Sequence, residues 1–193
     1  MSALDYLAEG RRVAIRAYTP ADAEEFTTRV RESRDVHRPW LFPPEDTRAY
    51  ATYAGRLNDD PTKAGFLVCE REREHEREQE AGEGGVGGGI AGFININNIV
   101  LGGFRCGALG YGAFAHAVGR GLMSEGLALV LRYAFGPLGL HRLEANIQPA
   151  NEGSIALVRR AGFRLEGFSP DFLFIDGAWR DHERWAITAE MLS

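Results

Sequence analysis

A strand pattern, a glycine-bearing turn and the start of a helix follow one another without a break between Leu109 and Glu125, in the sequence LGYGAFAHAVGRGLMSE. Backbone N–H groups of such a turn can converge on an anion, and the helix dipole adds about half a positive charge at the same place. The segment therefore predicts a site for a pyrophosphate group. It is not a dinucleotide-binding fingerprint, because Gly119-Arg120-Gly121 lacks the third glycine at its offset. A tight turn that holds no ligand is the alternative.

Apolar periodicity and turn residues divide the rest of the chain into short elements. Strands are predicted at 12–17, 65–69, 90–100, 108–114, 141–148, 163–174 and 179–188. Helices are predicted from 20 to a point before Pro39, and at 46–57, 121–135 and 151–162, with a stiff proline-rich loop over 38–44. The resulting order, β-α-α-β-β-β-α-β-α-β-β, predicts an α/β fold with a mixed sheet and helices on both of its faces.

Length and composition predict a single domain over residues 1–193. A chain of 193 residues has the size of one ordinary domain, and its 45% hydrophobic and 25% charged residues are typical of a globular protein. The exception is 71–89, where Glu, Arg and Gln are followed by glycines. Such a segment cannot contribute to a core, so we expect a flexible, solvated hairpin loop there. A partner-binding role for this loop is the alternative.

Charge and cysteine spacing argue against several classes of site. A net charge of −5 argues against a direct nucleic-acid partner. The sequence has neither a signal-peptide pattern nor an apolar run of about 20 residues, so we expect neither secretion nor membrane insertion. Cys69 and Cys106 lie far apart, which argues against a metal site and against a disulfide framework. We therefore expect no metal and a cytoplasmic location.

Two later segments also carry polar residues that could do chemistry. In ANIQPANEGS (145–154) a strand ends and a helix begins, and Asn151 and Ser154 could serve there only to cap the helix. In IDGAWRDHERW (175–185) Asp176-Gly177 predicts a hairpin turn. Two tryptophans and His182 beside several charges exceed what a turn needs.

In this order and spacing, the three segments resemble the GNAT superfamily of N-acetyltransferases, and within it the RimJ/RimL-type enzymes that acetylate ribosomal proteins. The resemblance runs from Arg12 to Ala189, apart from the charged insertion. The pieces that carry it are LGY (109–111), GRGLMSE (119–125), HRLEAN (141–146), N-x-x-S (151–154), RAGF (160–163) and DG-x-WRDH (176–182). It implies the GNAT fold, in which a central sheet splays open between flanking helices.

The resemblance also implies acetyl-CoA as co-substrate and the residues that bind it. The family's pyrophosphate motif, Q/R-x-x-G-x-G/A, falls on residues 118–123, and Val118 and Met123 depart from it at the first and last positions. Because backbone amides hold most of the pyrophosphate, these departures need not abolish binding. The pantetheine arm would pair with the strand edge near Ala113 and hydrogen-bond Asn151. The predicted cofactor-binding residues are Ala113, Val118, Gly119, Arg120, Gly121, Met123, Ser124 and Asn151.

The implied reaction is direct transfer of an acetyl group from a thioester to an amine. An ammonium must first lose a proton, and the departing thiolate must gain one. By similarity, Ser154 would protonate the thiolate. Related enzymes can use a Glu before the Gly-Tyr pair as base, but this chain has Ala108 there. We expect Glu144 and Asn146, which share one face of their strand, to take this role with a bound water; an ion-paired surface carboxylate is the alternative for Glu144.

Four further residues are candidates for the site. His116 and His182 could each titrate near neutral pH, and a surface or capping role is the alternative for both. Trp40, in the RPWL loop, resembles a substrate-side residue of the family. Trp40 and Tyr111 are predicted to line the acceptor pocket, with core packing as the alternative.

Three functions are compatible with this sequence. The first is acetylation of the N-terminal α-amine of a protein, with a ribosomal protein as one possibility. The second is acetylation of a small amine such as a polyamine, which needs only a different pocket. The third is a catalytically silent acetyl-CoA-binding module, which the alanine at position 108 suggests. The expected partners are acetyl-CoA and an amine acceptor, and the expected state is a monomer or homodimer.

Overall fold

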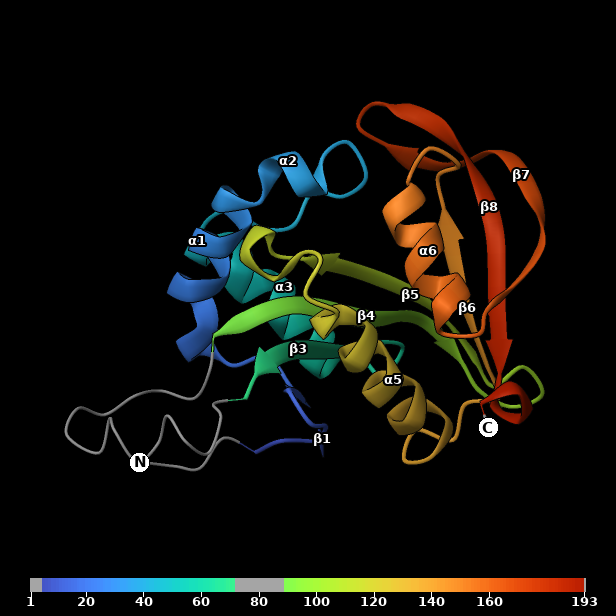
Figure 1. The fold of residues 1–193 in the computed structure, drawn as a ribbon, viewed down its shortest axis with the longest axis horizontal. Coiled ribbons are helices and arrows are strands. Elements are labelled where there is room, and N and C mark those ends of the chain that lie inside the picture. The colour runs from blue at the N-terminus through green and yellow to red at the C-terminus, as the bar shows by residue number, and fades with distance from the viewer. Residues whose placement is uncertain (1–4, 72–88, 193) are drawn as a thin grey trace.

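The computed structural model describes residues 5–71 and 89–192 (Figure 1). The loop predicted at 71–89 therefore lies, except for its two end residues, outside the described part of the chain. Within that part, eight strands form one sheet in the order β1-β2-β3-β4-β5-β6-β8-β7. Neighbouring strands are antiparallel except β5 and β6, which are parallel. The predicted mixed sheet is confirmed.

The strands lie close to their predicted positions, with one addition at the N-terminus. Their bounds are β1 Ala8–Glu9, β2 Val13–Arg16, β3 Ala64–Glu70, β4 Ile90–Val100, β5 Cys106–Ala113, β6 Arg142–Ile147, β7 Arg164–Ile175 and β8 Ala178–Thr188. Strand β1 was not predicted. It has two residues, too few for an alternating pattern to appear, and it is defined only by its pairing with β2.

Five helices accompany these strands in the described residues. Their bounds are α1 Ala23–Glu32, α2 Arg34–His37, α3 Thr47–Asp59, α5 Leu122–Phe135 and α6 Glu152–Arg160, and short 3-10 turns cover Pro20–Asp22, Ala115–Ala117 and Ala189–Met191. Helices α3 and α6 begin as predicted, because the Asp46 and Asn151 side chains accept hydrogen bonds from backbone N–H groups of their first turns.

The first predicted helix is divided in two at Ser33. The backbone of Ser33 leaves helical geometry, with φ −108° and ψ 14°. Its hydroxyl donates to the Arg29 carbonyl at 2.6 Å and accepts from the Ala115 N–H at 2.8 Å. This tertiary contact joins the end of α1 to the turn after β5, which a helix pattern in the sequence cannot show.

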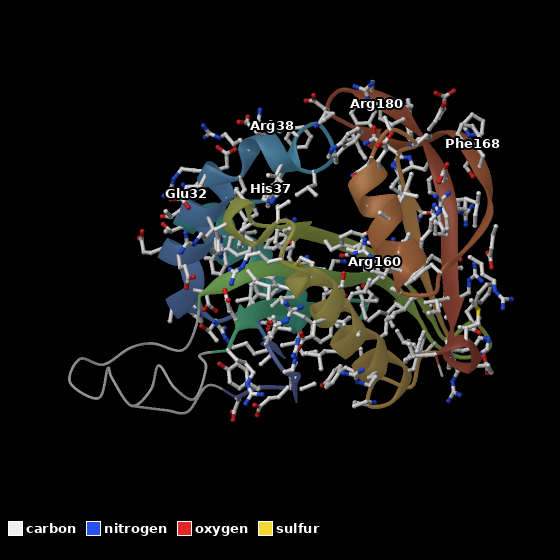
Figure 2. All side chains as sticks on the ribbon, in the orientation of Figure 1. Glu32, His37, Arg38, Arg160, Phe168 and Arg180 are labelled. Atoms are coloured by element: carbon white, nitrogen blue, oxygen red, sulfur yellow. The ribbon has the colours of Figure 1, made fainter. Side chains whose placement is uncertain are left out.

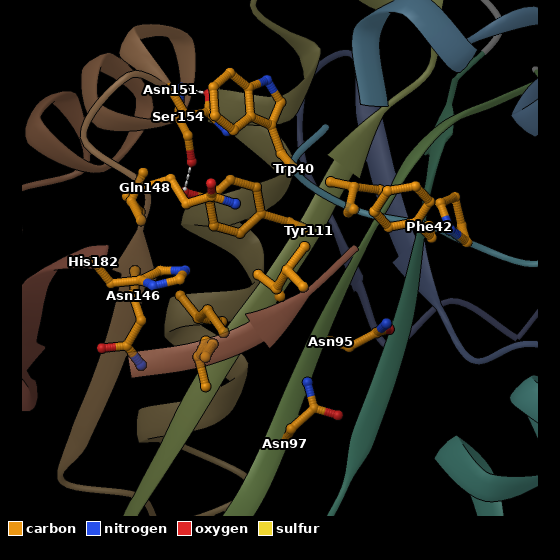
Figure 3. Close-up of a pocket in the computed structure, with 18 of the residues that line it drawn as sticks. Trp40, Phe42, Asn95, Asn97, Tyr111, Asn146, Gln148, Asn151, Ser154 and His182 are labelled. Carbon is orange, nitrogen blue, oxygen red and sulfur yellow. Dashed lines mark hydrogen bonds between the residues drawn. The ribbon is translucent and has the colours of Figure 1, made fainter. Parts of the chain in front are cut away.

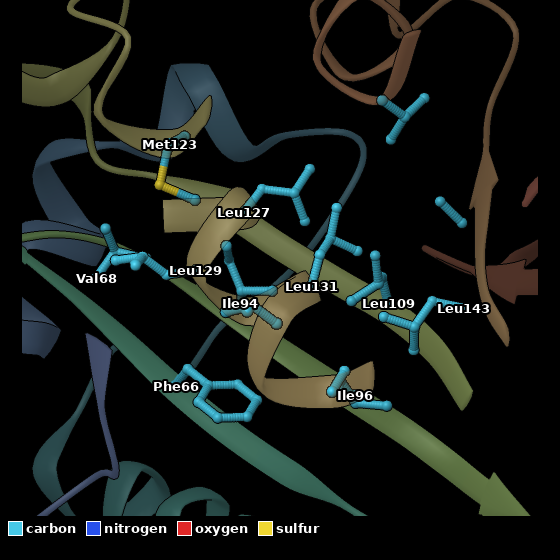
Figure 4. Packing of buried hydrophobic residues seen from close by; sticks show 14 of the residues in the cluster. Phe66, Val68, Ile94, Ile96, Leu109, Met123, Leu127, Leu129, Leu131 and Leu143 are labelled. Atoms are coloured by element: carbon cyan, nitrogen blue, oxygen red, sulfur yellow. The ribbon is translucent and has the colours of Figure 1, made fainter. Parts of the chain in front are cut away.

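The sheet separates two apolar layers. On β3, Phe66 and Val68 pack on the side of α5, within the cluster that Figure 4 shows, while Leu67 and Cys69 pack with aromatic residues of α1 and α3. Helix α5 lies very close to β3, since a Cβ added to Gly126 would meet both methyl groups of Val68 at 2.8 Å. The buried residues of α5 include Leu122, Gly126, Leu129 and Val130, which recur at steps of three and four along one face of the helix.

The centre of the sheet splays open between β5 and β6. Their parallel pairing ends at Leu109 and Ala145. Beyond this point β5 stays paired with β4 as far as Ala113, and β6 stays paired with β8 as far as Ile147 (Figure 1). The two strands therefore diverge, and the last residues of β5 present an open edge. The splayed sheet implied by the sequence resemblance is confirmed.

No helix within residues 5–71 and 89–192 has both the length and the apolar character needed to cross a bilayer.

Candidate active site

The open edge of β5 presents backbone groups to the space between β5 and β6. The Phe114 N–H donates to the Ala91 carbonyl of β4, so residues at alternate positions, Gly112 and Phe114, hydrogen-bond toward β4. The N–H and C=O groups of Tyr111 and Ala113 consequently face the open edge. The Ala113 carbonyl accepts a hydrogen bond from His37 Nε2 at 2.8 Å. This bond attaches α2 to the end of β5.

A cavity of about 420 Å³ lies along this edge. His37 of α2 and Arg160 of α6 border it from opposite sides (Figure 2). Most of the predicted cofactor residues line it, namely Ala113, Val118, Gly119, Gly121, Met123, Ser124 and Asn151. Arg120 does not, because its guanidinium is ion-paired with Glu70. We call this space the cofactor cavity.

The turn between β5 and α5 has the geometry of an anion site. Gly119 and Gly121 both have φ +75°, a conformation that disfavours other residues. Gly121 is the N-cap of α5, and in the described part of the chain no side chain caps the first N–H groups of this helix. These N–H groups, at the positive end of the helix dipole, are therefore available to an anion.

Arg12 on the neighbouring loop fixes this turn in place. Its Nη1 donates to the Arg120 carbonyl at 2.9 Å, and its backbone N and Nε donate to the Glu125 carboxylate at 2.7 and 3.0 Å. Burial opposes ionisation of Glu125, but the hydrogen bonds from Arg12 outweigh it and lower the pKa of Glu125. The carboxylate is therefore ionised at neutral pH and holds α5 against the start of β2.

A second cavity of about 360 Å³ adjoins the first (Figure 3). Five residues line both: Trp40, Leu41, Tyr111, Asn151 and Ser154. The polar residues found only in the second cavity are Tyr53, Asn95, Asn97, Asn146, Gln148 and His182. Within the described residues no Asp, Glu, Lys or Arg lines it. We call this space the acceptor cavity.

Tyr111 and Ser154 form a hydrogen-bonded pair where the two cavities meet. The Tyr111 hydroxyl and Ser154 Oγ are 2.6 Å apart (Figure 3). Burial raises the pKa of Tyr111 to about 12, although the bond with Ser154 acts in the opposite direction. The Tyr111 phenol is therefore protonated at neutral pH, and the pair can supply a proton at the junction.

Asn151 caps α6, as the purely structural interpretation of this segment proposed. Its Oδ1 accepts from the Ser154 backbone N–H at 3.1 Å. The cap uses the backbone of Ser154, so the Ser154 hydroxyl and the Asn151 amide nitrogen are not needed for it. Capping and a role in the cavities are compatible at both residues.

The structure separates the two residues that were expected to act as a base. Asn146 lines the acceptor cavity, and its Oδ1 is buried without a hydrogen-bond partner in the described residues. Glu144 does not line either cavity. Its carboxylate lies 3.0 Å from Arg142 Nε and 3.3 Å from Arg184 Nη2. These two ion pairs hold Glu144 on the surface of the sheet, as its alternative interpretation proposed.

Residues 12–164 match the family model described as an acetyltransferase (GNAT) domain. The chain belongs to the GNAT acetyltransferase family. The predicted family and fold are thus confirmed.

Individual relatives agree with this GNAT assignment. The chain is 42% identical over 99 residues to the ribosomal protein uS5-alanine N-acetyltransferase of Escherichia coli K12, and this match spans about half of both chains, 51% of each. It is 29% identical over 188 residues to the probable N-acetyltransferase YjcK of Bacillus subtilis 168, which covers 93% of this chain and 95% of the relative. Among solved structures, RimJ of Mycobacterium smegmatis in complex with CoA-disulfide has a TM-score of 0.78 at 27% identity, covering 92% of this chain and 82% of that one.

Several residues of the acceptor cavity were not among the predicted site residues of this GNAT chain. Asn95 and Asn97 alternate with buried Ile94 and Ile96 on β4, a pattern that could have shown them to share the face opposite α5. His37, which borders the cofactor cavity, was also not among the predicted site residues. It lies in α2, within the range that was predicted as a single helix. Burial lowers the pKa of His37, although the bond to Ala113 opposes this.

The two candidate histidines have different surroundings. His116 lies in the turn after β5 but lines neither cavity. His182 is only 2% exposed and lines the acceptor cavity. The alternative interpretation of His182 as a surface residue therefore does not agree with its buried position.

Proposed function

We propose that this chain transfers the acetyl group of acetyl-CoA to a primary amine, and that the acceptor is the N-terminal α-amine of a protein. The observation that carries the proposal is the meeting of two cavities at the Tyr111–Ser154 pair. One cavity has an anion-binding turn and an open strand edge, and the other has neutral polar groups. A thioester and an amine that entered from the two sides would meet beside a proton donor.

The residues of the cofactor cavity fit coenzyme A. The first N–H groups of α5 suit a pyrophosphate, and the free backbone groups of Tyr111 on the open edge suit the amides of a pantetheine arm. The Asn151 amide nitrogen can donate to the same arm. The RimJ structure with CoA-disulfide supports this use of the fold. When bound, acetyl-CoA supplies the activated acetyl group.

We assign protonation of the departing thiolate to Ser154, with Tyr111 as its source of a proton. The 2.6 Å hydrogen bond between the two hydroxyls lets a proton pass from Tyr111 to Ser154 as Ser154 donates its own. Both residues line the two cavities, so the donor lies where the C–S bond would break.

The lining of the acceptor cavity favours a peptide N-terminus over a polyamine. A polyamine carries further positive charges, and burying them without a carboxylate is costly. The acceptor cavity has no carboxylate in its described lining, but it has the amides of Asn95, Asn97, Asn146 and Gln148. Amides can hydrogen-bond the backbone of a peptide. The relative named for acetylation of a ribosomal protein alanine supports the same acceptor.

Release of free CoA from acetyl-CoA with three matched acceptors tests this proposal. The first acceptor is a peptide with a free N-terminal alanine and one internal lysine, the second is the same peptide with a blocked N-terminus, and the third is spermidine. We expect turnover with the first and little with the others. Equal or faster turnover of spermidine would establish the small-amine alternative, and acetyl-CoA binding without turnover of any amine would establish the silent binding module.

A further inference from the structure

We propose that Nε2 of His182 is the base that takes a proton from the acceptor ammonium. This inference rests on the acetyl transfer proposed above. It assigns a role that the sequence had given to Glu144 and Asn146.

The position of His182 is the first observation behind this assignment. Its side chain belongs to β8, is 2% exposed and lines the acceptor cavity. Figure 3 shows its ring above Asn146, among the side chains that line the cavity. The ring of Phe172 on β7 packs against it in a T-shaped arrangement, with centroids 5.9 Å apart. The imidazole is therefore held in one orientation at the wall of the cavity.

The tautomer of His182 follows from its hydrogen bond. Nδ1 lies 2.8 Å from the Arg180 carbonyl oxygen. A carbonyl can only accept, so Nδ1 carries the hydrogen and Nε2 of the neutral ring has a free lone pair. Within residues 5–71 and 89–192, Nε2 has no hydrogen-bond partner. The lone pair is available to a group in the cavity.

No other side chain in the described lining of the acceptor cavity can accept a proton at neutral pH. The lining contains no carboxylate. Its other ionisable groups are Tyr53 and Tyr111, and burial raises the pKa of both. Both phenols therefore remain protonated, and amide side chains are not bases. His182 is the group that remains.

Charged residues on the surrounding strands do not offer a competing base. Glu144 on β6 is neutralised by Arg142 and Arg184. The guanidinium of Arg184 lies over the Phe172 ring, 4.9 Å from its centroid. The other ionisable residues on the elements that pack around His182 are Arg180, Asp181 and Glu183 on β8, Arg164, Glu166 and Asp171 on β7, and Cys106 and Tyr111 on β5. Glu166 is itself ion-paired with Arg142.

The proposed proton transfers balance over one turnover. The ammonium gives one proton to Nε2, and the freed nitrogen lone pair forms a C–N bond with the thioester carbonyl carbon. The C–S bond then breaks, its electron pair goes to sulfur, and Ser154 protonates the thiolate. The second proton of the nitrogen replaces the one that left the Tyr111–Ser154 pair. The products are the acetamide, the CoA thiol and one proton, which His182 releases to solvent.

The variant His182→Asn tests this role, because its amide nitrogen can keep the bond to the Arg180 carbonyl while the proton-accepting nitrogen is lost. We expect kcat with a peptide acceptor to fall about 100-fold at pH 7, the lower part of the range for a general base. The deficit should shrink as the pH rises above about 8, where an α-amine arrives unprotonated. The KM for acetyl-CoA should be unchanged.

His141→Asn is the matched control. His141 is half exposed, lies 3.4 Å from Glu190 and lines neither cavity, so this variant should keep the wild-type profile. A loss in His182→Asn that is equal at every pH would show a structural role and overturn the inference. Wild-type activity in this variant would also overturn it, while leaving the acetyl transfer intact.

The wild-type protein provides a second measurement that does not depend on how the variant folds. With a base in the cavity, kcat/KM for the peptide should stay close to its pH 8 value when the pH is lowered below 8. Without one, it should follow the free-amine fraction and fall about tenfold per pH unit. The second result would overturn the inference. Absence of any turnover by the wild-type protein would overturn the proposed function and this inference with it.

Discussion

The cofactor cavity and the acceptor cavity are built in different ways. The cofactor cavity takes most of its lining from the continuous stretch 111–124 and from the start of α6, and its anion site consists of backbone groups. The acceptor cavity collects side chains from 40–43, from Tyr53, from three central strands and from the β7–β8 hairpin. A site made of backbone depends on local conformation, whereas a site made of side chains depends on how distant segments pack.

This difference explains which residues could be found in advance. A glycine turn before a helix can be identified by its spacing, because φ angles and free N–H groups follow from local sequence. The local sequence made His182 a candidate but fitted a surface or capping role equally well, and it did not single out Asn95. Both line one cavity only because β4 and β8 bring them together there.

The largest effect that we expect at the junction is from Ser154→Ala. This variant keeps the α6 cap, because Asn151 binds the backbone N–H of residue 154. We expect kcat to fall about 100-fold, as for loss of a general acid, with little change in acetyl-CoA affinity measured by calorimetry. Tyr111→Phe keeps the serine and should lose only about tenfold, the value of one hydrogen bond. If acetyl-CoA affinity fell as much as kcat, Ser154 would contribute to cofactor binding and not specifically to proton transfer.

A smaller effect is expected where the cofactor cavity depends on backbone conformation. Alanine at Gly119, where φ is +75°, adds about 1–2 kcal/mol of strain, and relief of this strain would turn the loop away from its ligand. We expect the Kd for acetyl-CoA to rise about tenfold. Gly139→Ala is the control, since φ is +64° there and the residue lines neither cavity; it should lose similar stability and keep the Kd. An unchanged Kd in both variants would contradict a backbone-built anion site.

The smallest effect is expected where one charge enters the acceptor cavity. Asn97→Asp places a carboxylate in a lining that has none, and it should raise kcat/KM for spermidine relative to the peptide about two- to fivefold, as for a partly solvated ion pair. Asn98→Asp adds the same charge on an exposed neighbouring residue that does not line the cavity. This variant should leave kcat/KM unchanged for both spermidine and the peptide. Equal effects of both variants would show that long-range charge, and not the lining, selects the acceptor.

Several features could be predicted because they are written in local patterns. The positions of β3 and β4 and the starts of α3 and α6 lie close to where the sequence placed them. The break at Ser33 could not be predicted, because its hydroxyl is held by the distant Ala115 N–H. Arg120 was expected among the cofactor-binding residues, and the structure shows its side chain ion-paired with Glu70. The single domain, the loop at 71–89, the cytoplasmic location and the oligomeric state stay predictions.

The sequence by itself determined the family, most of the succession of elements and the glycine turn before α5, because each depends on periodicity, on glycine conformation or on a motif of neighbouring residues. Only the tertiary structure decided which side chains share a cavity. Glu144 and Asn146 occupy the same face of β6, yet two arginines engage the first while the second lines the acceptor cavity. Strand alternation specifies a face, and the positions of neighbouring strands specify what that face meets.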